Sequence, residues 1–288
     1  MHVQHQSARY QDVSSWELSD SFWERCKPFL PKPKSRLRGR GKRRKHIGGR
    51  PPADPRKTLA GILYVLRTGC QWDAAPKSEF GSGKTLHRYF QFWSRCGVFK
   101  KLWRAGLTEY DEIKGLEWRW QAVDGCLTKA PLGGDLTGPN PTDRSKSGTK
   151  RSLLVEGKGL PVAIVVGPAN RNDAKLLAAT LDSIVVERPG ADDTTQNLCL
   201  DKGYAGQPTQ DCATERGYQA HVPDKANAKQ KRKRKPGRRK ARRYVVEVTH
   251  SWLNRFRRLL IRWEKKRSNY LSLLYFACAI ICWRKCEV

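Results

Sequence analysis

The stretch Trp118-Arg-Trp-Gln-Ala-Val-Asp-Gly125 decides the fold class of this chain. Its aromatic and β-branched residues favour a strand at residues 118–123, and the pair Asp124-Gly125 is typical of a strand end. The composition changes near Gly115, because residues before it follow a helical spacing and residues after it favour strands. We therefore predict a helical region at residues 1–112 and an α/β domain at residues 113–288.

The rest of the second domain alternates strand and helix signals. Glycine-bounded apolar runs predict strands, and apolar residues at helical spacing predict helices. The predicted elements are a hairpin at residues 153–166, a helix capped by Asn172 or Asp173 and ending near residue 186, strands at 197–200 and 218–222, and helices at 244–263 and 269–284. This order indicates a mixed α/β layer fold.

The first domain is predicted to contain short helices. Asp54-Pro55 suits the N-cap and first position of a helix that ends at Gly69. Further helices are predicted from Ser82 or Lys84 to residue 96 and at residues 99–107, an arrangement compatible with a helix-turn-helix-like module. An ordinary three-helix bundle with solvated charges is the alternative. In the DNA-binding interpretation, the second helix presents Lys84, His87, Arg88 and Gln91.

The charge balance indicates a polyanionic partner. The chain carries 57 Lys and Arg against 27 Asp and Glu, a formal net charge of +30. Such an excess causes self-repulsion, which nucleic acid relieves as its counterions are released. We find neither an amphipathic anchor nor an apolar run of the ~20 residues that a membrane span requires. The basic tract at residues 225–243 is expected to be mobile without DNA, and the segment 32–50 is a linker or a DNA-contacting arm.

Several other classes of protein are excluded by missing motifs. The nine cysteines form no C-x-x-C pair, so we expect reduced, mostly buried thiols in the cytoplasm. The chain has no G-x-S-x-G nucleophile elbow and no H-E-x-x-H zinc motif. Gly83-Lys-Thr85 lacks the earlier glycine of a phosphate-binding loop, because residue 78 is Ser78.

Three acidic residues form the candidate active site. Asp124 and Asp201 each end a predicted strand, and Glu247 lies on the helix after the basic tract. Three such carboxylates can hold two divalent ions about 4 Å apart, and oxygen ligands suit Mg²⁺, or Mn²⁺ as a substitute. Each acid also has a structural interpretation: either Asp as a turn residue, and Glu247 as the ion-pair partner of Arg243 four residues earlier.

Longer motifs surround these acids. They are Gly49-Arg-Pro-Pro52, Leu66-Arg-Thr-Gly-Cys-Gln-Trp72, Val123-Asp-Gly125, Gly138-Pro-Asn-Pro-Thr-Asp143, Gly148-Thr-Lys-Arg-Ser152, Leu200-Asp-Lys-Gly-Tyr204, Arg243-Tyr-Val-Val-Glu247 and Trp252-Leu-Asn-Arg-Phe-Arg-Arg258. With them, nearly the whole chain resembles bacterial insertion-sequence transposases of the DDE class, in the insertion-sequence-five branch. Two positions depart from the family pattern: Val248 stands where an Arg is common, and Asn254 stands where a Lys is expected.

The resemblance implies both a fold and an activity. The fold is a ribonuclease H-like mixed sheet with flanking helices, preceded by a small all-α helix-turn-helix-like DNA-binding domain. The activity is Mg²⁺-dependent cleavage and strand transfer of double-stranded DNA at the terminal inverted repeats of a mobile element. Asp124, Asp201 and Glu247 would be the catalytic metal ligands of a homodimer or larger assembly on DNA. The expected location is the bacterial cytoplasm, at the nucleoid.

Basic residues complete the predicted site, and two rival functions fit the same charge. The predicted DNA contacts are Lys84, His87, Arg88, Lys150, Arg151, Arg243, Arg255, Arg257 and Arg258. One rival is a catalytically decayed transposase acting as a DNA-binding repressor, which would not need three acids in matching contexts. The other is an RNA-binding protein that stacks bases on tryptophans, although most of the tryptophans fall at core spacing.

Overall fold

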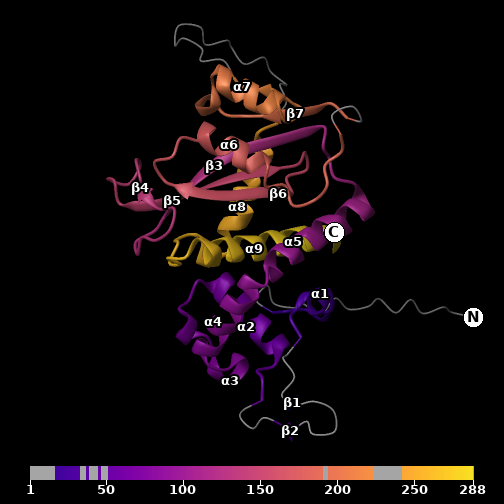
Figure 1. Cartoon of the computed structure of the whole chain (residues 1–288), viewed down its shortest axis with the longest axis vertical. Coiled ribbons are helices and arrows are strands. Elements are labelled where there is room, and N and C mark those ends of the chain that lie inside the picture. The colour runs from indigo at the N-terminus through magenta and orange to yellow at the C-terminus, as the bar shows by residue number, and fades with distance from the viewer. Residues whose placement is uncertain are drawn as a thin grey trace, which may run out of the picture.

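The computed structural model of the chain describes residues 17–32, 37–38, 45–46, 51–190, 194–223 and 242–287. The predicted mobile tract lies outside these residues, apart from Arg242 and Arg243, and so does most of the predicted arm. A mixed sheet lies at one end of the molecule and a group of short helices at the other, with two long helices between them (Figure 1). No helix in the described part of the chain is long and apolar enough to cross a membrane.

The sheet is built outward from β3. Its strand order is β4–β5–β3–β7–β8, and β6 also pairs with β5. The pairs β3–β5 and β5–β6 are antiparallel, whereas β3–β7 and β7–β8 are parallel. This order confirms the predicted mixed α/β class and is the ribonuclease H-like arrangement that the motifs imply. The strands are β3 (Trp120–Lys129), β4 (Gly138–Pro139), β5 (Ser147–Val155), β6 (Pro161–Pro168), β7 (Gln196–Cys199) and β8 (Tyr218–His221).

The prediction that the first strand ends at Asp124 was wrong. β3 continues to Lys129, because β5 pairs with it along its whole second half, from Asp124↔Leu153 to Lys129↔Gly148. The parallel neighbour β7 does stop close by, since its last register pair is Ala122↔Cys199. Asp124 therefore lies inside a strand, at the point where one of its two neighbouring strands has ended.

Helices cover both faces of the sheet. Ser152 of β5 hydrogen-bonds Thr180 of α6 at 2.7 Å, whereas its neighbour Arg151 donates to Asn254 of α8 at 2.9 Å. Since successive side chains of a strand point to opposite faces, α6 and α8 lie on opposite sides of the sheet. The second half of the chain contains α6 (Ala174–Leu181), α7 (Gln207–Thr214), which the sequence did not predict, α8 (Tyr244–Asn254) and α9 (Arg267–Glu287).

The helix predicted at residues 244–263 is shorter than expected. α8 ends at Asn254, and a 3₁₀ turn (Arg257–Leu259) follows. Ile261 then forms a parallel bridge with Lys129, and the amide of Arg262 donates to the carbonyl of Lys129 at 2.8 Å. The chain leaves the helix because its backbone pairs with the end of β3.

The helices α2 and α4 begin and end where local chemistry predicts. The Asp54 carboxylate caps α2 by accepting from the amides of Arg56 and Lys57, and Gly69 ends it in the left-handed conformation with φ 74°. The third predicted helix is longer than expected, because α5 continues to Lys114. The helices are α1 (Asp20–Cys26), α2 (Pro55–Thr68), α3 (Lys77–Phe80), α4 (Gly83–Arg95) and α5 (Val98–Lys114), and the short strands β1 (Leu37–Arg38) and β2 (Lys45–His46) pair between α1 and α2.

One hydrophobic core joins the helical end to the sheet. α5 and α9 lie side by side between the two ends of the molecule (Figure 1). The side chain of Trp103 on α5 stacks on Tyr275 of α9 and donates a hydrogen bond to the carbonyl of Pro161 in β6 at 2.9 Å. The division at residue 112 remains a prediction, and it falls within the last turn of α5.

Candidate active site

Asp124 and Asp201 are brought together by the parallel pair β3–β7. Their last register pair is Ala122↔Cys199, and each Asp follows two residues later on its own strand. Neighbouring strands lie about 4.8 Å apart, so the two acids leave the same edge of the sheet as neighbours. The Asp124 carboxylate accepts from the amide of Gly125 at 2.9 Å, and the Asp201 carboxylate accepts from that of Lys202 at 2.7 Å.

Glu247 reaches the same place from the first turn of α8. One guanidinium links it to the strand acids: Arg243 Nη2 lies 2.9 Å from Glu247 Oε1, and Nη1 lies 3.0 Å from Asp201 Oδ1. The positive charge of Arg243 also acts on Asp124. The structure thus gathers the three predicted acids around Arg243. The Arg243–Glu247 ion pair, which was the structural interpretation of Glu247, is part of this cluster.

A fourth acid, Asp173, adjoins the cluster. The sequence suggested it only as a helix cap, but Asn172 makes the cap-like hydrogen bond, accepting from the amide of Ala174 at 2.9 Å. Asp173 Oδ2 instead accepts from Lys150 Nζ at 3.0 Å, and its Oδ1 is buried without a hydrogen-bond partner. The available signal was an acid soon after a strand in a chain with few acids.

The environment of Asp124 favours its neutral form. Burial raises the pKa of its carboxyl above the usual range, and the negative charges of Asp201 and Asp173 add to the rise. The Gly125 amide and the Arg243 guanidinium oppose it. A divalent cation beside Asp124 would stabilise its charged form, because a nearby positive charge favours an ionised carboxylate.

The donor atoms of this cluster fit a divalent cation. Carboxylate oxygens are the ligands that Mg²⁺ and Mn²⁺ prefer. A positive group already lies between Asp201 and Glu247, so the fold accommodates a cation there. Among the described residues, no three Asp, Glu, His or Cys side chains are already placed to hold one metal ion. Metal binding therefore requires these acids to rearrange around the position of Arg243.

The predicted DNA contacts divide into exposed and buried residues. Lys84, Arg88, Arg255 and Arg257 are exposed. The half-buried ring of His87 lies 5.1 Å from that of Trp72, and burial lowers the pKa of its imidazole. A lowered pKa disfavours the positively charged form of His87, so it is a weaker candidate for a phosphate contact than Lys84 and Arg88 on α4.

Burial removes three residues from the predicted contact set. Lys150 is 8% exposed and pairs with Asp173, and Arg151 is 1% exposed on the α8 face of β5. Arg258 is 7% exposed and donates to Glu264 at 2.7 and 2.9 Å. We expect these three side chains to stabilise the fold, because each would have to lose its present hydrogen-bond or ion-pair partners to reach a phosphate.

The Lys-to-Asn departure at position 254 has a structural reason. The Asn254 Oδ1 atom accepts from Arg151 Nη2 at 2.9 Å, and Cys126 Sγ lies 3.2 Å from the same nitrogen. A lysine at position 254 would bring a second cation against this guanidinium and remove its acceptor. Nothing in the structure explains Val248.

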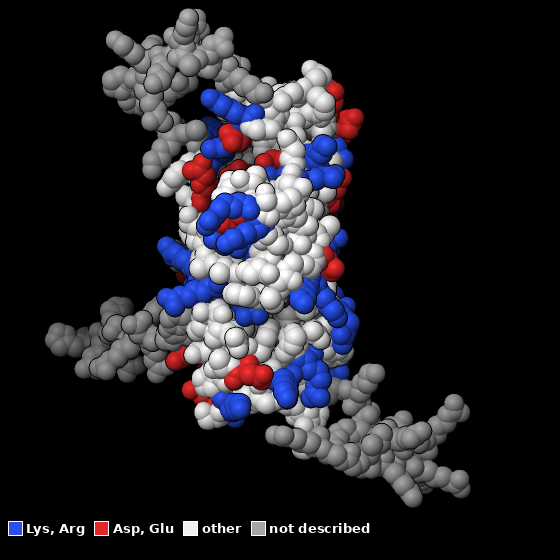
Figure 2. Space-filling view, turned by 90° about the vertical axis from the view of Figure 1, so that its left-hand side faces the viewer, with Lys and Arg blue, Asp and Glu red and all other residues white. Residues whose placement is uncertain are grey.

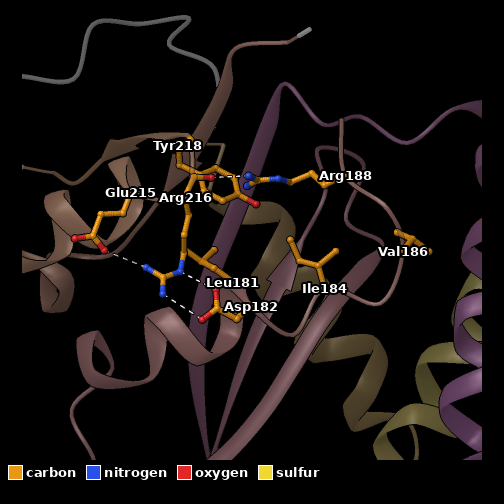
Figure 3. A pocket seen from close by; sticks show the side chains of 9 residues that line it. Leu181, Asp182, Ile184, Val186, Arg188, Glu215, Arg216 and Tyr218 are labelled. Carbon is orange, nitrogen blue, oxygen red and sulfur yellow. Dashed lines mark hydrogen bonds and ion pairs between the residues drawn. The ribbon is translucent and has the colours of Figure 1, made fainter. Parts of the chain in front are cut away.

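A cavity at the other end of β8 from these acids is lined by residues of α6, β8 and the segments beside them. It has a volume of about 450 Å³ and lies between the end of α6 and the start of β8 (Figure 3). Arg216 donates to Asp182 at 2.7 and 3.1 Å, and the Arg188 guanidinium lies 4.2 Å from the centre of the Tyr218 ring. Its two arginines are thus engaged within the protein, and we assign no ligand to it.

The sheet order and the acids at adjacent strands and on the following helix place this protein in the ribonuclease H-like class. Residues 121–282 match the family model described as "Transposase DDE domain", and residues 18–103 match "Putative transposase of IS4/5 family". The chain belongs to the IS4/5 family of DDE transposases, as its motifs predicted.

Two relatives from Burkholderia cepacia agree with this assignment. The chain is 34% identical over 150 residues to the Burkholderia cepacia "Putative transposase for insertion sequence element IS402", covering 51% of this chain and 68% of that protein. It is 32% identical over 125 residues to the "Insertion element IS402 uncharacterized 16.2 kDa protein" of the same organism, covering 43% of this chain and 80% of that protein. The catalytic domain of Mos1 mariner transposase matches with 11% identity and a TM-score of 0.28, over 65% of this chain and 91% of that chain.

Proposed function

We propose that this transposase binds the terminal inverted repeats of its element and catalyses Mg²⁺-dependent DNA strand cleavage and strand transfer, with Mn²⁺ able to substitute. The observation that supports this most is the position of Asp124 and Asp201, each two residues beyond one strand pair, with Arg243 joining Asp201 to Glu247. A protein that only binds DNA gains nothing from carboxylates gathered beside phosphates, because like charges repel.

Asp124, Asp201 and Glu247 would hold divalent ions, which supply charge neutralisation and lower the pKa of an attacking hydroxyl. In cleavage, a water oxygen bonds to phosphorus as the bond to the 3′ oxygen breaks, leaving a 3′-hydroxyl and a 5′-phosphate. In strand transfer, that 3′-hydroxyl attacks a target phosphodiester and displaces its 3′ oxygen, which takes up a proton. The side chains contribute positioning and electrostatic stabilisation to both steps, and the exposed Arg255 and Arg257 would neutralise backbone charge.

The test is cleavage of a labelled duplex that carries the element's own end, with Mg²⁺. Asp124→Asn and Glu247→Gln should bind this duplex and not cut it, because each loses a metal-binding carboxylate. Glu112→Gln, which neutralises an exposed acid on α5, is the control and should cut normally. Normal cutting by Asp124→Asn would refute the assignment, and binding without cutting by the unmodified protein would instead support the decayed, repressor-like alternative.

The helical end is proposed to hold the terminal repeats. Lys84 and Arg88 are exposed on α4, and the face shown in Figure 2 carries Lys and Arg side chains at its lower, helical end as well as above it. Removing one side chain that binds a phosphate should reduce the slope of log affinity against log salt by about 0.9. We expect Lys84→Ala and Arg88→Ala to show this reduction and Arg104→Ala, an exposed residue of α5, to show none. Unchanged slopes for both α4 variants would move the DNA interface elsewhere.

The active form is proposed to be a homodimer or larger assembly on double-stranded DNA at the bacterial nucleoid. Each element has two ends, and pairing them requires at least two copies of a site that holds one end. Sedimentation of the protein with an end duplex should show two protein chains per complex or more. A complex with one chain that still joins both ends to a target would contradict this proposal.

A further inference from the structure

Arg243 is held by two carboxylates of the site, against the dipole of helix α8. It occupies the N-cap position of α8, where the helix dipole presents partial positive charge. A cation is unfavourable at that position unless carboxylates offset it. Its two guanidinium nitrogens lie 3.0 Å from Asp201 Oδ1 and 2.9 Å from Glu247 Oε1. The side chain therefore lies there because it neutralises acids from two different elements.

The same guanidinium uses oxygen atoms that a metal ion would need. Asp201 Oδ1 also accepts from the Lys202 amide, and Glu247 Oε1 accepts only from Arg243 among the described hydrogen bonds. A divalent ion bound between these oxygens would carry two positive charges to within a few ångströms of the guanidinium. Since like charges at that distance repel strongly, metal and arginine cannot both keep their contacts.

We propose that Arg243 is the internal counterion of this site: it takes the cation position between Asp201 and Glu247 in the metal-free protein and is displaced when a divalent ion binds. This proposal rests on the proposed function, because it assumes that these acids are metal ligands. Displacement frees the guanidinium on the surface that receives DNA. Metal binding and phosphate binding are then coupled through one side chain, because the ion releases the group that the phosphate accepts.

Removing the counterion should strengthen metal binding. Each ion pair joins groups that are partly exposed, with 29% of the Arg243 side chain and 48% of each carboxylate side chain accessible. Partly exposed pairs are weak, so removing both should tighten metal binding by about 2- to 10-fold. A purely structural role predicts the opposite, because acids that Arg243 had kept in place would scatter and bind metal less well.

The experiment measures Mn²⁺ binding to the full chain without DNA, by the decrease of the free-ion electron paramagnetic resonance signal. Arg243→Gln should bind Mn²⁺ about 2- to 10-fold more tightly than the unmodified protein. Arg242→Gln is the matched control, because this neighbouring guanidinium stacks 4.0 Å from the centre of the Trp120 ring and has no carboxylate partner among the described residues. It removes the same charge and should change the affinity less than twofold, a bound set by the weakness of screened surface charges.

Arg243→Lys keeps the charge without the two-pronged contact, so its Mn²⁺ affinity should fall between those of the unmodified protein and Arg243→Gln. It also provides the comparison if Arg243→Gln does not fold. Equal or weaker Mn²⁺ binding by the Arg243 variants, with normal binding by the unmodified protein, would overturn the counterion proposal alone. Absence of Mn²⁺ binding in every variant, together with absence of cleavage, would overturn the proposed function as well.

Discussion

Substituting Gly125 by alanine tests how closely Asp173, the fourth acid of the candidate site, packs against strand β3. A Cβ at this position would overlap Asp173 Oδ1 and lie 3.1 Å from Asp173 Cγ. Gly125 does not have the left-handed backbone conformation that disfavours alanine. The cost of the substitution is therefore steric, and it falls on Asp173.

The magnitude follows from what holds Asp173. Its carboxylate must retreat by roughly 1 Å to restore an ordinary contact, and Oδ2 is tied to Lys150, which itself donates to the carbonyl of Arg171 at 2.8 Å. Overpacking of this kind typically costs about 1–3 kcal/mol, and a weakened, partly exposed ion pair adds less than about 1 kcal/mol. We expect Gly125→Ala to lower the free energy of unfolding by about 1–3 kcal/mol.

Urea unfolding measures this change, and a second glycine provides the control. Gly203 lies two residues after Asp201, and a Cβ there would meet nothing within 4 Å. Gly203→Ala should therefore stay within about 0.5 kcal/mol of the unmodified protein. The double variant Gly125→Ala with Asp173→Ala should be more stable, by about 1 kcal/mol or more, than the sum of the two single effects predicts. Additive effects of the two substitutions, or a Gly125→Ala protein as stable as the Gly203→Ala control, would show that Asp173 does not pack tightly against Gly125.

Three further predictions concern buried polar groups. Burial, helped by the charge of Arg151, lowers the pKa of His250 from 6.5 to about 3. The unfolded state therefore binds a proton that the folded state does not, so the stability contribution is complete above about pH 6.5 and falls by about 1.4 kcal/mol per pH unit below it. His250→Phe should flatten the dependence of the urea-derived unfolding free energy on pH between about pH 6 and 4.5. If the slope of that dependence is unchanged, His250 is not its source. Arg258→Gln should lower the free energy of unfolding, measured with heat or urea, by about 3–5 kcal/mol, because it leaves the buried Glu264 carboxylate without its ion-pair partner. A variant that stays stable but binds DNA with altered affinity would show that Arg258 contacts DNA. Asn254→Lys should lower the free energy of unfolding by about 1–3 kcal/mol, and Asn254→Asp should not, because only the lysine variant removes the side-chain oxygen at position 254 that accepts from Arg151. Equal urea midpoints for the two variants would contradict this reason.

Local chemistry in the sequence predicted the bounds of α2 and α4, and it failed where pairing with a distant segment determined the structure. Asp54 and Gly69 mark α2 correctly, since a cap depends only on residues within one turn. The pair Asp124-Gly125 has an equally strong turn signal, but β5 supplies a partner for the strand beyond it. No feature near residue 124 in the chain announces that partner, which is contributed by residues more than twenty positions later.

The candidate site shows the same division. Asp124, Asp201 and Glu247 were found because each stands in a motif of several residues. Asp173 was missed as a member of the cluster because its neighbours across space, Gly125 and Lys150, belong to other strands. The alternation of β5 places Arg151 on the α8 face, and a basic residue beside Lys150 gave no sign of that burial.

The pairing of α5 with α9 has a consequence for how the chain acquires its structure. Trp283 of α9 donates to Glu109 of α5 across 174 residues, so this contact closes a loop that contains the entire sheet. Contacts of such long separation form late, because the chain must first lose the entropy of closing the loop. During synthesis, α9 also emerges after every other described element. Until then α5 exposes the apolar stripe that α9 will cover, and a chain with such an exposed surface is prone to aggregation and open to chaperones and proteases.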